Sequence, residues 1–414
     1  MRKYFLGRAA LIAVLALVTI LAGCSISTDD TVSKALCVAT DFPASGADGA
    51  QGKPAQNGAD LAISQAKLSG GYTLVARDKD DATNGMHDEG LGAMNVISVA
   101  SDDCVLALVG PLHDSVAAAE MPIAANAGLA MISPATSNAG LTKKEAANAY
   151  GLDYAALHPA EKPLTFFRLP VPDDGQAVAD AQLALDAGHK HAYIVDDAQI
   201  TGKALATFFA QAFAARGGSV VGSDSLLDTA AQKLVDLAGQ IKAAGADVVY
   251  YSGLTSAAGA ALRLAMTNAD LVNVAMIGGR GIADDPMFIQ AATPAAAEGT
   301  LATLPAADLA ALMSPAAQQF TKDYKTRYGT DATSAAVYGF DAASVVVAAI
   351  GAVIDAGQTP TRENVRRQIA TGAYQGLTGL LSFDANGDDV GTQLVSVYSV
   401  RNGSWVFVKR ASAV

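Results

Sequence analysis

Residues 105–136, VLALVGPLHDSVAAAEMPIAANAGLAMISPAT, predict a strand, a helix and a second strand in immediate succession. VLALVG is a short unbroken apolar run, SVAAAEMPIAANAG is Ala-rich and ends at a glycine, and LAMIS is apolar again. A strand, a crossover helix and a further strand of these lengths form a βαβ unit, which belongs to a parallel sheet with helices on its faces. The stretch therefore predicts an α/β fold.

The same alternation extends in both directions from this unit. Upstream, ALCVAT (35–40) is strand-like, and a helical stretch separates it from a second strand-like run, YTLVARDKDD (72–81). Downstream, residues 138–163 have no clean period, and a second series of strands and helices runs from FFRLPV (166–171) to VAMIGG (274–279). Two such series in tandem, in a chain of this length, indicate two domains rather than one core.

The last third of the chain is mixed. A strand-like GTLATL is followed by two helical stretches, of which the second (333–357) is long and apolar. Tyr338, Asp341 and Asp355 interrupt its apolar character, so we interpret it as a core helix rather than a membrane span. Near the end, Arg401-Asn402-Gly403 joins two alternating strand-like runs, and Asn-Gly in this position is typical of a β-hairpin.

The N-terminal residues have the layout of a secretory signal peptide. The first eight carry three positive charges and no acid, and residues 9–22 are almost purely apolar but shorter than the ~20 residues that span a membrane. The run ends in Leu21-Ala22-Gly23-Cys24, which resembles the bacterial lipobox. We expect a signal peptide over 1–23, a diacyl lipid on Cys24 and a polar linker over 24–34; the alternative is an ordinary signal peptide with a cysteine nearby.

The charge of the chain excludes one class of partner. Without residues 1–23, 25 of the 28 positive charges remain against 40 acidic residues, a net charge of −15. An acidic chain of this kind argues against nucleic acid as a partner. A hydrophobic content of 51% also argues against a disordered chain.

Two cysteines are left once Cys24 is assigned to the lipid. Export would place Cys37 and Cys104 in an environment that permits a disulfide. Each cysteine begins an apolar run, CVAT and CVLALVG. If these runs are neighbouring parallel strands, their starts lie side by side and a bridge can form. Two buried free thiols are the alternative.

No set of residues typical of catalysis or metal binding stands out. The five histidines are scattered in the sequence, and the chain has no P-loop, HExxH, CxxC or G-x-S-x-G motif. His189 and His191 flank Lys190 at a helix-to-strand junction, which indicates a solvated turn. Residues 384–388, DANGD, resemble a calcium loop but lack its distal acidic residue, which favours a turn. We expect no catalytic residue, no cofactor and no metal.

Two segments instead have the composition of a binding site. GPLHDS (110–115) lies between a strand and a helix, where open α/β sheets bind ligands and where free helix N–H groups favour an anion. Ser115 would add a hydroxyl donor there. ISPATSN (132–138) follows the next strand, so the hydroxyls of Thr136 and Ser137 would emerge at the same edge. A plain helix cap and a plain loop are the alternatives.

These segments, in this order, resemble the type I periplasmic binding proteins, and most closely their leucine/isoleucine/valine-binding branch. The matching stretches cover nearly all of residues 35–410: GPLHDSVAAAEMPIAANAGLAMISPATSNAGLT, FFRLPVPDDGQAVA, ADVVYYSGLT, IGGRGIADDPMFI, YGFDAA and LLSFDANGD. The resemblance implies two α/β lobes, each a mainly parallel sheet flanked by helices, joined by three crossover strands. The expected crossings are 167–173, 299–305 and 378–383, with lobe 1 at 35–167 plus 305–378 and lobe 2 at 168–304 plus 379–414.

The resemblance also implies a function. The chain would be an exported, membrane-anchored solute receptor that delivers an amino acid or related small carboxylate to the permease subunits of an ABC importer. Its ligand would bind between two lobes that close by a hinge, and we expect a monomer. A sensory module that reports to a membrane receptor kinase is the alternative. An extracellular hydrolase is a third reading, but the sequence offers no nucleophile–base pair for it.

Site residues follow from the same resemblance. In the amino-acid binders of the family, the ligand carboxylate rests on the first lobe. Carried over, Asp114 and Ser115 occupy the helix start, while Ala135 supplies a carbonyl to the ammonium and Ser137 a hydroxyl to the carboxylate. Asp173 falls at the hinge, where the second lobe supplies a carboxylate.

Three further positions depart from the family pattern or modify it. Gln51 aligns with an aromatic residue that covers the side-chain pocket, and Leu254 stands where some members have a tyrosine. Arg280 stands where amino-acid binders have an acidic residue for the ammonium. An arginine there would repel an ammonium and attract a carboxylate, phosphate or aromatic ring. Pairing of Arg280 with Asp173 or Asp284 is the alternative, and it would leave the amino-acid site partly intact.

Overall fold

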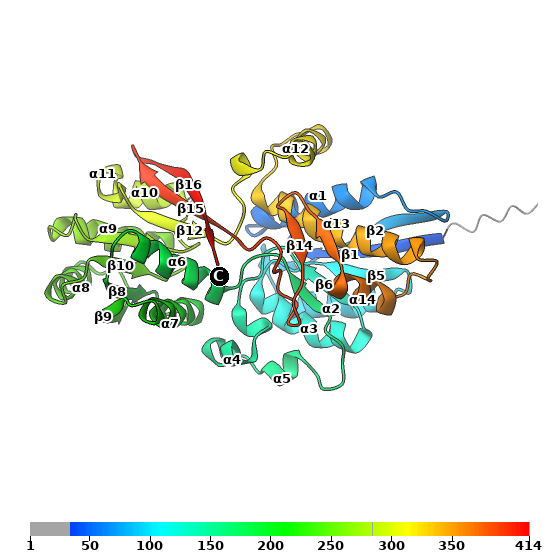
Figure 1. Ribbon diagram of the computed structural model, residues 1–414, viewed down its shortest axis with the longest axis horizontal. Helices are drawn as coiled ribbons and strands as arrows, with labels where there is room; N and C mark the ends of the chain where they lie inside the picture. The colour runs from blue at the N-terminus through cyan, green and yellow to red at the C-terminus, as the bar shows by residue number, and fades with distance from the viewer. Residues whose placement is uncertain (1–33, 284, 414) are drawn as a thin grey trace, which may run out of the picture. The chain divides into compact units, whose positions relative to one another are not determined.

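The computed structural model describes residues 34–283 and 285–413. The expected signal peptide (1–23), Cys24 with its lipid and the linker up to residue 33 lie outside the described residues, as does Asp284. Two large sheets, each with its own helices, make up the described chain (Figure 1). The predicted α/β fold with two lobes is therefore confirmed.

The first sheet has five strands in the order β2-β1-β5-β6-β7. The pairs β1–β5, β5–β6 and β6–β7 are parallel. The βαβ unit predicted over 105–136 is present as β5, the helix α3 (Asp114–Ala127) and β6. The strand bounds are β1 Lys34–Phe42, β2 Tyr72–Asp80, β5 Val105–Val109, β6 Ala130–Ser133 and β7 Phe166–Arg168.

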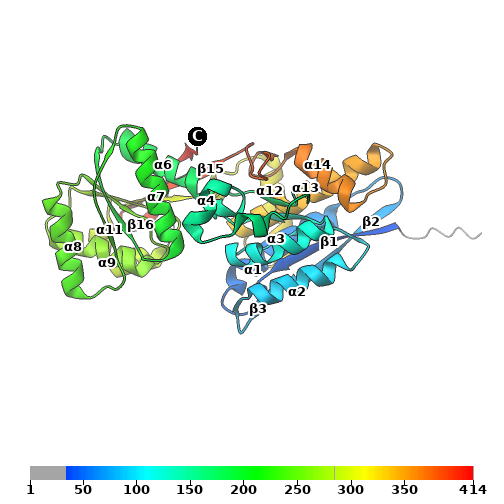
Figure 2. The same ribbon diagram turned by 90° about the horizontal axis from the view of Figure 1, so that it is seen from below.

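Helices cover both faces of the first sheet because its strands are apolar on both sides. Val38, Ile132 and Phe167 pack with helices α1, α13 and α14, whereas their sequence neighbours Met131 and Phe166 pack with α2 and α3. This alternation is the two-residue period of a strand. Figure 2 shows α14 and α2 on opposite sides of β1. The bounds are α1 Gly49–Gln65, α2 Glu89–Ala100, α13 Ser334–Asp355 and α14 Arg362–Thr371.

Adjacent starts of β1 and β5 bring the two described cysteines together. Cys37 is paired in register with Val105, the residue after Cys104. The two sulfur atoms are bonded, and the Cα atoms lie 5.0 Å apart. The bridge considered from the sequence is thus present in the structure, at the end of the sheet opposite to the loops that follow the strands.

The second sheet has seven strands in the order β16-β15-β12-β11-β10-β8-β9. Helices α6 and α7 cover one face, and α8, α9, α10 and α11 cover the other. The strand bounds are β8 His191–Asp196, β9 Ser219–Ser225, β10 Val248–Tyr251, β11 Ala275–Gly278, β12 Leu301–Leu304, β15 Leu394–Arg401 and β16 Ser404–Ser412. The helix bounds are α6 Asp173–Asp186, α7 Ile200–Ala215, α8 Ala231–Ala243, α9 Ser256–Asn268, α10 Pro286–Ala292 and α11 Pro294–Ala297.

Two local predictions concern the C-terminal third. β15 and β16 form the expected hairpin, with Asn402 and Gly403 both at positive φ, as a tight two-residue turn requires. Helix α13 is, among the described residues, the one helix long and apolar enough to cross a membrane, but 67% of its most apolar window is buried inside the protein. It therefore serves as a core helix of the first lobe.

Shorter elements connect these layers. A small hairpin, β3 Ala82–Thr83 with β4 Met86–His87, follows β2. The segment between β6 and β7 forms short helices, and its Tyr150 packs on Phe208 of α7. The remaining bounds are η1 Ala139–Leu141, α4 Lys144–Ala147, η2 Asn148–Tyr150, α5 Tyr154–Leu157, η3 Leu309–Ala311, α12 Pro315–Tyr328, β13 Ala373–Gln375 and β14 Leu380–Ser382.

The third crossing between the lobes lies further along the chain than expected. We expected it at 378–383, with lobe 2 resuming at residue 379. Instead, β14 pairs with β13, and Leu381 and Phe383 belong to the core of the first lobe. Phe383 packs on Phe167 at a ring distance of 5.0 Å, and Asp388 binds the buried Arg168 at 2.7 Å. These contacts hold the segment on lobe 1 until β15 begins.

Candidate functional site

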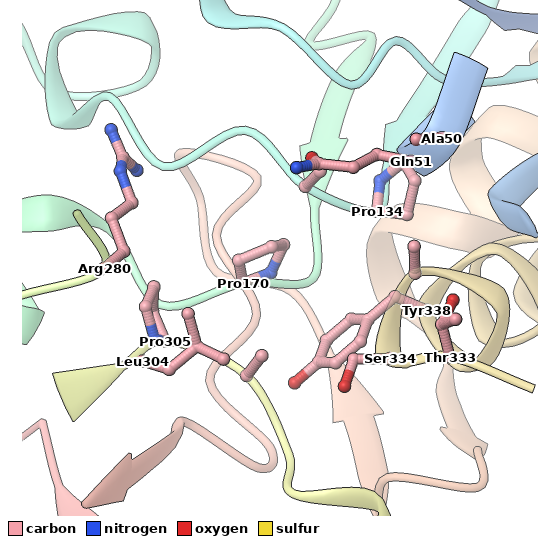
Figure 3. Close-up of a pocket in the computed structure, with 13 residues that line it drawn as sticks. Ala50, Gln51, Pro134, Pro170, Arg280, Leu304, Pro305, Thr333, Ser334 and Tyr338 are labelled. Atoms are coloured by element: carbon pink, nitrogen blue, oxygen red, sulfur yellow. The ribbon is translucent and has the colours of Figure 1, made fainter. Parts of the chain in front are cut away.

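A cavity of about 420 Å³ lies among loops that follow the strands of both sheets. This is the edge at which open α/β sheets bind ligands. Figure 3 shows Arg280 on one side of the cavity, Gln51 and Tyr338 on the other, and Pro170 between them. The lining residues are Ala50, Gln51, Pro134, Ala135, Pro170, Arg280, Leu304, Pro305, Ala306, Thr333, Ser334, Ala335 and Tyr338.

The first lobe supplies an apolar wall with a few neutral polar groups. Gln51 comes from the first turn of α1, where it is exposed, and Ala135 comes from the loop after β6. Tyr338 comes from α13, and its hydroxyl accepts a hydrogen bond from the backbone N–H of Ala307 at 3.0 Å. That bond fixes the ring beside the second crossing, so the phenol presents an ordered flat surface to the cavity.

The second lobe contributes Arg280, from the loop after β11. Its Nη1 donates to Asp173 Oδ1 at 3.2 Å, and its Nη2 lies 4.0 Å from Asp114 Oδ2. Asp173 is fully buried at the start of α6, whereas 22% of the Arg280 side chain stays exposed. The two carboxylates therefore hold the guanidinium in place while part of it faces the cavity.

Hydrogen bonds from the first lobe complete the surroundings of Asp173. Tyr150 donates its hydroxyl to Asp173 Oδ2 at 2.7 Å, and the Asp173 N–H donates to the carbonyl of Ser137 at 2.8 Å. Burial raises the pKa of Asp173, and the positive charge of Arg280 opposes that rise. Burial would lower the pKa of Arg280, but the charges of Asp173 and Asp114 outweigh it and raise that pKa. In each case the charge of the partner favours the ionised form of the other group.

Asp114 changes what the loop after β6 can offer to a ligand. Its Oδ1 accepts hydrogen bonds from the backbone N–H groups of Ser137 at 3.0 Å and Asn138 at 3.1 Å. These N–H groups belong to the loop whose hydroxyls we expected to face a ligand carboxylate. Ser115, the next residue of α3, is exposed and does not line the cavity. A carboxylate of the chain itself thus accepts the N–H groups of Ser137 and Asn138.

The other predicted residues lie behind or beside the cavity. Thr136 and Ser137 are buried and do not line it. Leu254 is 37% exposed, and its N–H donates to Asp197 Oδ2 at 2.7 Å. It lies against the backbone of Gly281, next to Arg280, because a Cβ added to Gly281 would meet Leu254 Cα at 2.5 Å. Of the predicted set, only Gln51, Ala135 and Arg280 line the cavity directly.

Several lining residues were missed from the sequence. Pro170 and Pro305 stand on the first and second crossings, and Thr333, Ser334 and Tyr338 come from the start of α13. Tyr338 interrupts an otherwise apolar helix, and this signal was visible but was assigned to the core. The prolines carried no comparable signal, because a proline in a loop is common for conformational reasons alone.

Comparisons with known proteins agree with this architecture. A family model described as periplasmic binding protein matches residues 38–404. Among curated proteins, the Leu/Ile/Val-binding protein BraC3 of Rhizobium johnstonii is 29% identical over 267 residues, which are 63% of this chain and 65% of that protein. The matched region thus spans slightly less than two thirds of that relative.

Solved structures with the same fold cover almost the whole chain. A leucine-binding protein of Thermotoga maritima matches with a TM-score of 0.67 and 22% identity, over 91% of this chain and 99% of that one. An ABC transporter solute-binding protein of R. palustris in complex with benzoate matches with a TM-score of 0.63 and 21% identity, over 92% and 97%. At these identities the likeness establishes the fold and leaves the ligand to be argued from the cavity.

Proposed function

The chain belongs to the periplasmic binding protein family, and from that membership we propose that it is the extracytoplasmic solute-binding protein of an ABC importer. Its solute is a small carboxylate with an apolar body. The family is one of binding proteins, not of enzymes. The two lobes close on the solute by a hinge and release it to the permease subunits.

One observation carries the choice of a carboxylate. Arg280 is the only charged side chain among the described residues that line the cavity; the others are apolar or neutral. A guanidinium has five N–H donors, and Asp173 receives one of them at hydrogen-bonding distance. The remaining donors suit a planar carboxylate, which arginine binds with two parallel hydrogen bonds. The ion pair with Asp173 holds the Arg280 guanidinium in one orientation before the ligand arrives, which reduces the entropy lost on binding.

The apolar part of the cavity supports a ring or a branched chain as the ligand body. Pro134, Pro170, Leu304, Pro305 and Tyr338 all contribute to the wall. A volume of about 420 Å³ is within the range of small-molecule sites. The benzoate complex of the R. palustris protein is one precedent for such a ligand on this fold.

An amino acid fits the cavity less well. Its ammonium would need a carboxylate or several carbonyl groups, and the described lining contains no carboxylate. The Asp173 and Asp114 carboxylates are turned to Arg280 and, in the case of Asp114, to the loop N–H groups. We therefore favour an aromatic or branched monocarboxylate over leucine or isoleucine.

The lipid anchor is part of the same proposal. A receptor whose permease lies in the membrane works best when it is held near that membrane, and a diacyl group on Cys24 supplies two chains, enough for stable attachment. Globomycin, which blocks the lipoprotein signal peptidase, should leave the leader uncut. Cleavage that continues unchanged would contradict the lipid on Cys24.

Thermal shift measurements test the binding function directly. The purified chain is heated with benzoate, other aromatic and branched monocarboxylates, and leucine, isoleucine and valine. At a hundredfold excess over Kd, a bound ligand stabilises the native state by ~2.7 kcal/mol. Benzamide is the matched control, because it has the same ring without the charge. A shift with carboxylates and none with benzamide supports the proposal; no shift with any small solute would count against a binding function.

A further inference from the structure

Three loops of the first lobe bring together a group of side chains that does not line the solute cavity. Asp48 immediately precedes α1, His87 belongs to β4 of the small hairpin after β2, and His113 immediately precedes α3. The strands β2, β1 and β5 are neighbours in the sheet, so the loops after them meet at one edge. In the sequence these histidines are scattered; the fold places them side by side.

The side chains meet at close range. His87 Nδ1 lies 2.7 Å from Asp48 Oδ2, and His113 Nε2 lies 3.8 Å from the same oxygen. The two imidazole rings stack with their centroids 3.7 Å apart and a tilt of 13°. One donor atom from each residue lies within 4.8 Å of both others. All three side chains are 23–28% exposed, although His113 Nε2 itself is buried between its neighbours.

The hydrogen bonds within this cluster do not use every atom that could bind a metal ion. An aspartate before a helix ordinarily accepts a hydrogen bond from the first turn, but the Asp48 side chain makes no such bond with α1. Its Oδ2 instead accepts the backbone N–H of His87 at 2.8 Å and lies beside both imidazoles. His113 Nε2 is buried and has no hydrogen-bond partner among the described residues. A salt bridge between Asp48 and His87 alone would not account for the position of His113.

The backbone holds the loops in this arrangement. The N–H of Asp48 donates to the carbonyl of Gly85 at 3.1 Å. Gly46 approaches Gly85 so closely that a Cβ on Gly46 would lie 1.9 Å from Gly85 Cα. The loops that carry Asp48 and His87 are thus fixed relative to each other before any ion binds, which favours a preformed site.

We propose that Asp48, His87 and His113 form a binding site for a divalent transition metal, with Zn²⁺ as the best fit. Two imidazole nitrogens and one carboxylate oxygen are a common zinc donor set, and each lies about 2.0–2.2 Å from the ion. Two ligands of one tetrahedral ion are therefore roughly 3.3–3.5 Å apart. The observed 2.7 and 3.8 Å lie on either side of that separation. The imidazole rings, now stacked at 3.7 Å, would have to turn so that both ring planes contain the ion. The exposed side leaves a fourth position for water.

Isothermal titration of ZnCl₂ into the EDTA-stripped full chain tests this site, without any organic solute. We expect one Zn²⁺ per chain and a loss of at least about 100-fold in affinity for His87→Ala and for His113→Ala, since even an outer partner of a metal ligand is worth 10–100-fold. His113→Ala is the safer variant, because His113 Nε2 makes no hydrogen bond that the change would remove, and the alanine keeps the backbone carbonyl that accepts from Ala117. The visible d–d bands of bound Co²⁺ provide a second readout of nitrogen ligation.

His191→Ala is the matched control. His191 is exposed at the start of β8, in the other sheet, and should leave zinc binding unchanged. Wild-type chain that binds no zinc, His113→Ala with wild-type affinity, or loss of binding in His191→Ala would each overturn the proposal. Because the titration needs no solute, its outcome is separate from that of the solute-binding test.

Discussion

Replacement of Arg280 by alanine should have two separable effects, one on stability and one on binding. Arg280 pairs at 3.2 Å with Asp173, which is fully buried and cannot turn to solvent. In Arg280→Ala this carboxylate keeps its hydrogen bond from Tyr150 but loses its counter-charge. The same change removes the one charged group of the described cavity lining.

The magnitudes follow from this geometry. Breaking a buried pair costs about 3–5 kcal/mol, and partial exposure of Arg280 places the loss near the lower end, about 3 kcal/mol. With an unfolding entropy of ~2.1 cal/mol/K per residue over roughly 380 residues, that corresponds to a fall of about 4 °C in Tm. Loss of a charge-assisted hydrogen bond to the ligand costs about 1.5–3 kcal/mol, which weakens carboxylate binding about 10- to 150-fold.

A second variant separates the two effects. In Arg280→Ala with Asp173→Asn, no buried charge is left unpaired, and the amide still accepts from Tyr150. Differential scanning calorimetry should show most of the lost stability restored, while calorimetric titration with benzoate should still show weak binding. Arg77→Ala is the control: its pair with Asp102 is about 40% exposed on both sides and should change neither quantity. Wild-type affinity in Arg280→Ala, or a double variant no more stable than the single one, would refute the reasoning.

Three further predictions concern other parts of the first lobe. Replacing Cys37 and Cys104 by serine should lower the free energy of unfolding by about 4 kcal/mol, because the bridge spans 67 residues of sequence; an unchanged urea midpoint would contradict this. Burial raises the pKa of Asp41 to about 7 and that of Glu120 well above its usual value. An acid whose pKa is raised by folding binds its proton more tightly in the folded state, so it stabilises the fold at low pH. The free energy of unfolding should therefore decrease as the pH rises from about 4 to 7, by up to ~1.4 kcal/mol per pH unit and per group. Glu120→Gln should flatten this dependence in urea titrations, and an equally steep fall would speak against it. Asp114→Asn removes a negative charge 4.0 Å from the cavity's guanidinium, so benzoate should bind several-fold more tightly by calorimetric titration, and weaker binding would exclude this role.

The fold could be predicted from the sequence because its signal is local. Strands of the first sheet alternate with helices along the chain, and apolar runs such as VLALVG mark strands buried on both faces. The third crossing could not be placed in the same way. Whether LLSF belongs to one lobe or the other depends on the contact of Phe383 with Phe167, more than two hundred residues earlier in the sequence.

The resemblance selected Gln51, Ala135 and Arg280, which line the cavity, and their role in ligand binding stays a prediction. The hydrogen bonding around them could not be predicted. The sequence could not show that Asp114 accepts the N–H groups of Ser137 and Asn138, which lie 23 and 24 residues away. Long-range side-chain contacts of this kind decide which donors remain for a ligand, and no sequence period reports them.

The convergence of histidines illustrates the same limit. His87 and His113 are 26 positions apart and carry no metal-binding spacing, so the sequence predicted no metal site. Their stacking depends on the order of β2, β1 and β5 in the sheet and on the close approach of two glycine-containing loops. The two imidazoles come close to the Asp48 carboxylate only when the strands have assembled into the sheet.

A crystal structure of the chain with benzoate bound tests most directly whether Arg280 anchors the solute carboxylate. The account predicts both carboxylate oxygens at about 2.7–3.0 Å from the Arg280 guanidinium, with the ring against Pro170 and Tyr338. A carboxylate bound instead to the backbone N–H groups of Ser137 and Asn138, with Asp114 displaced, would contradict it.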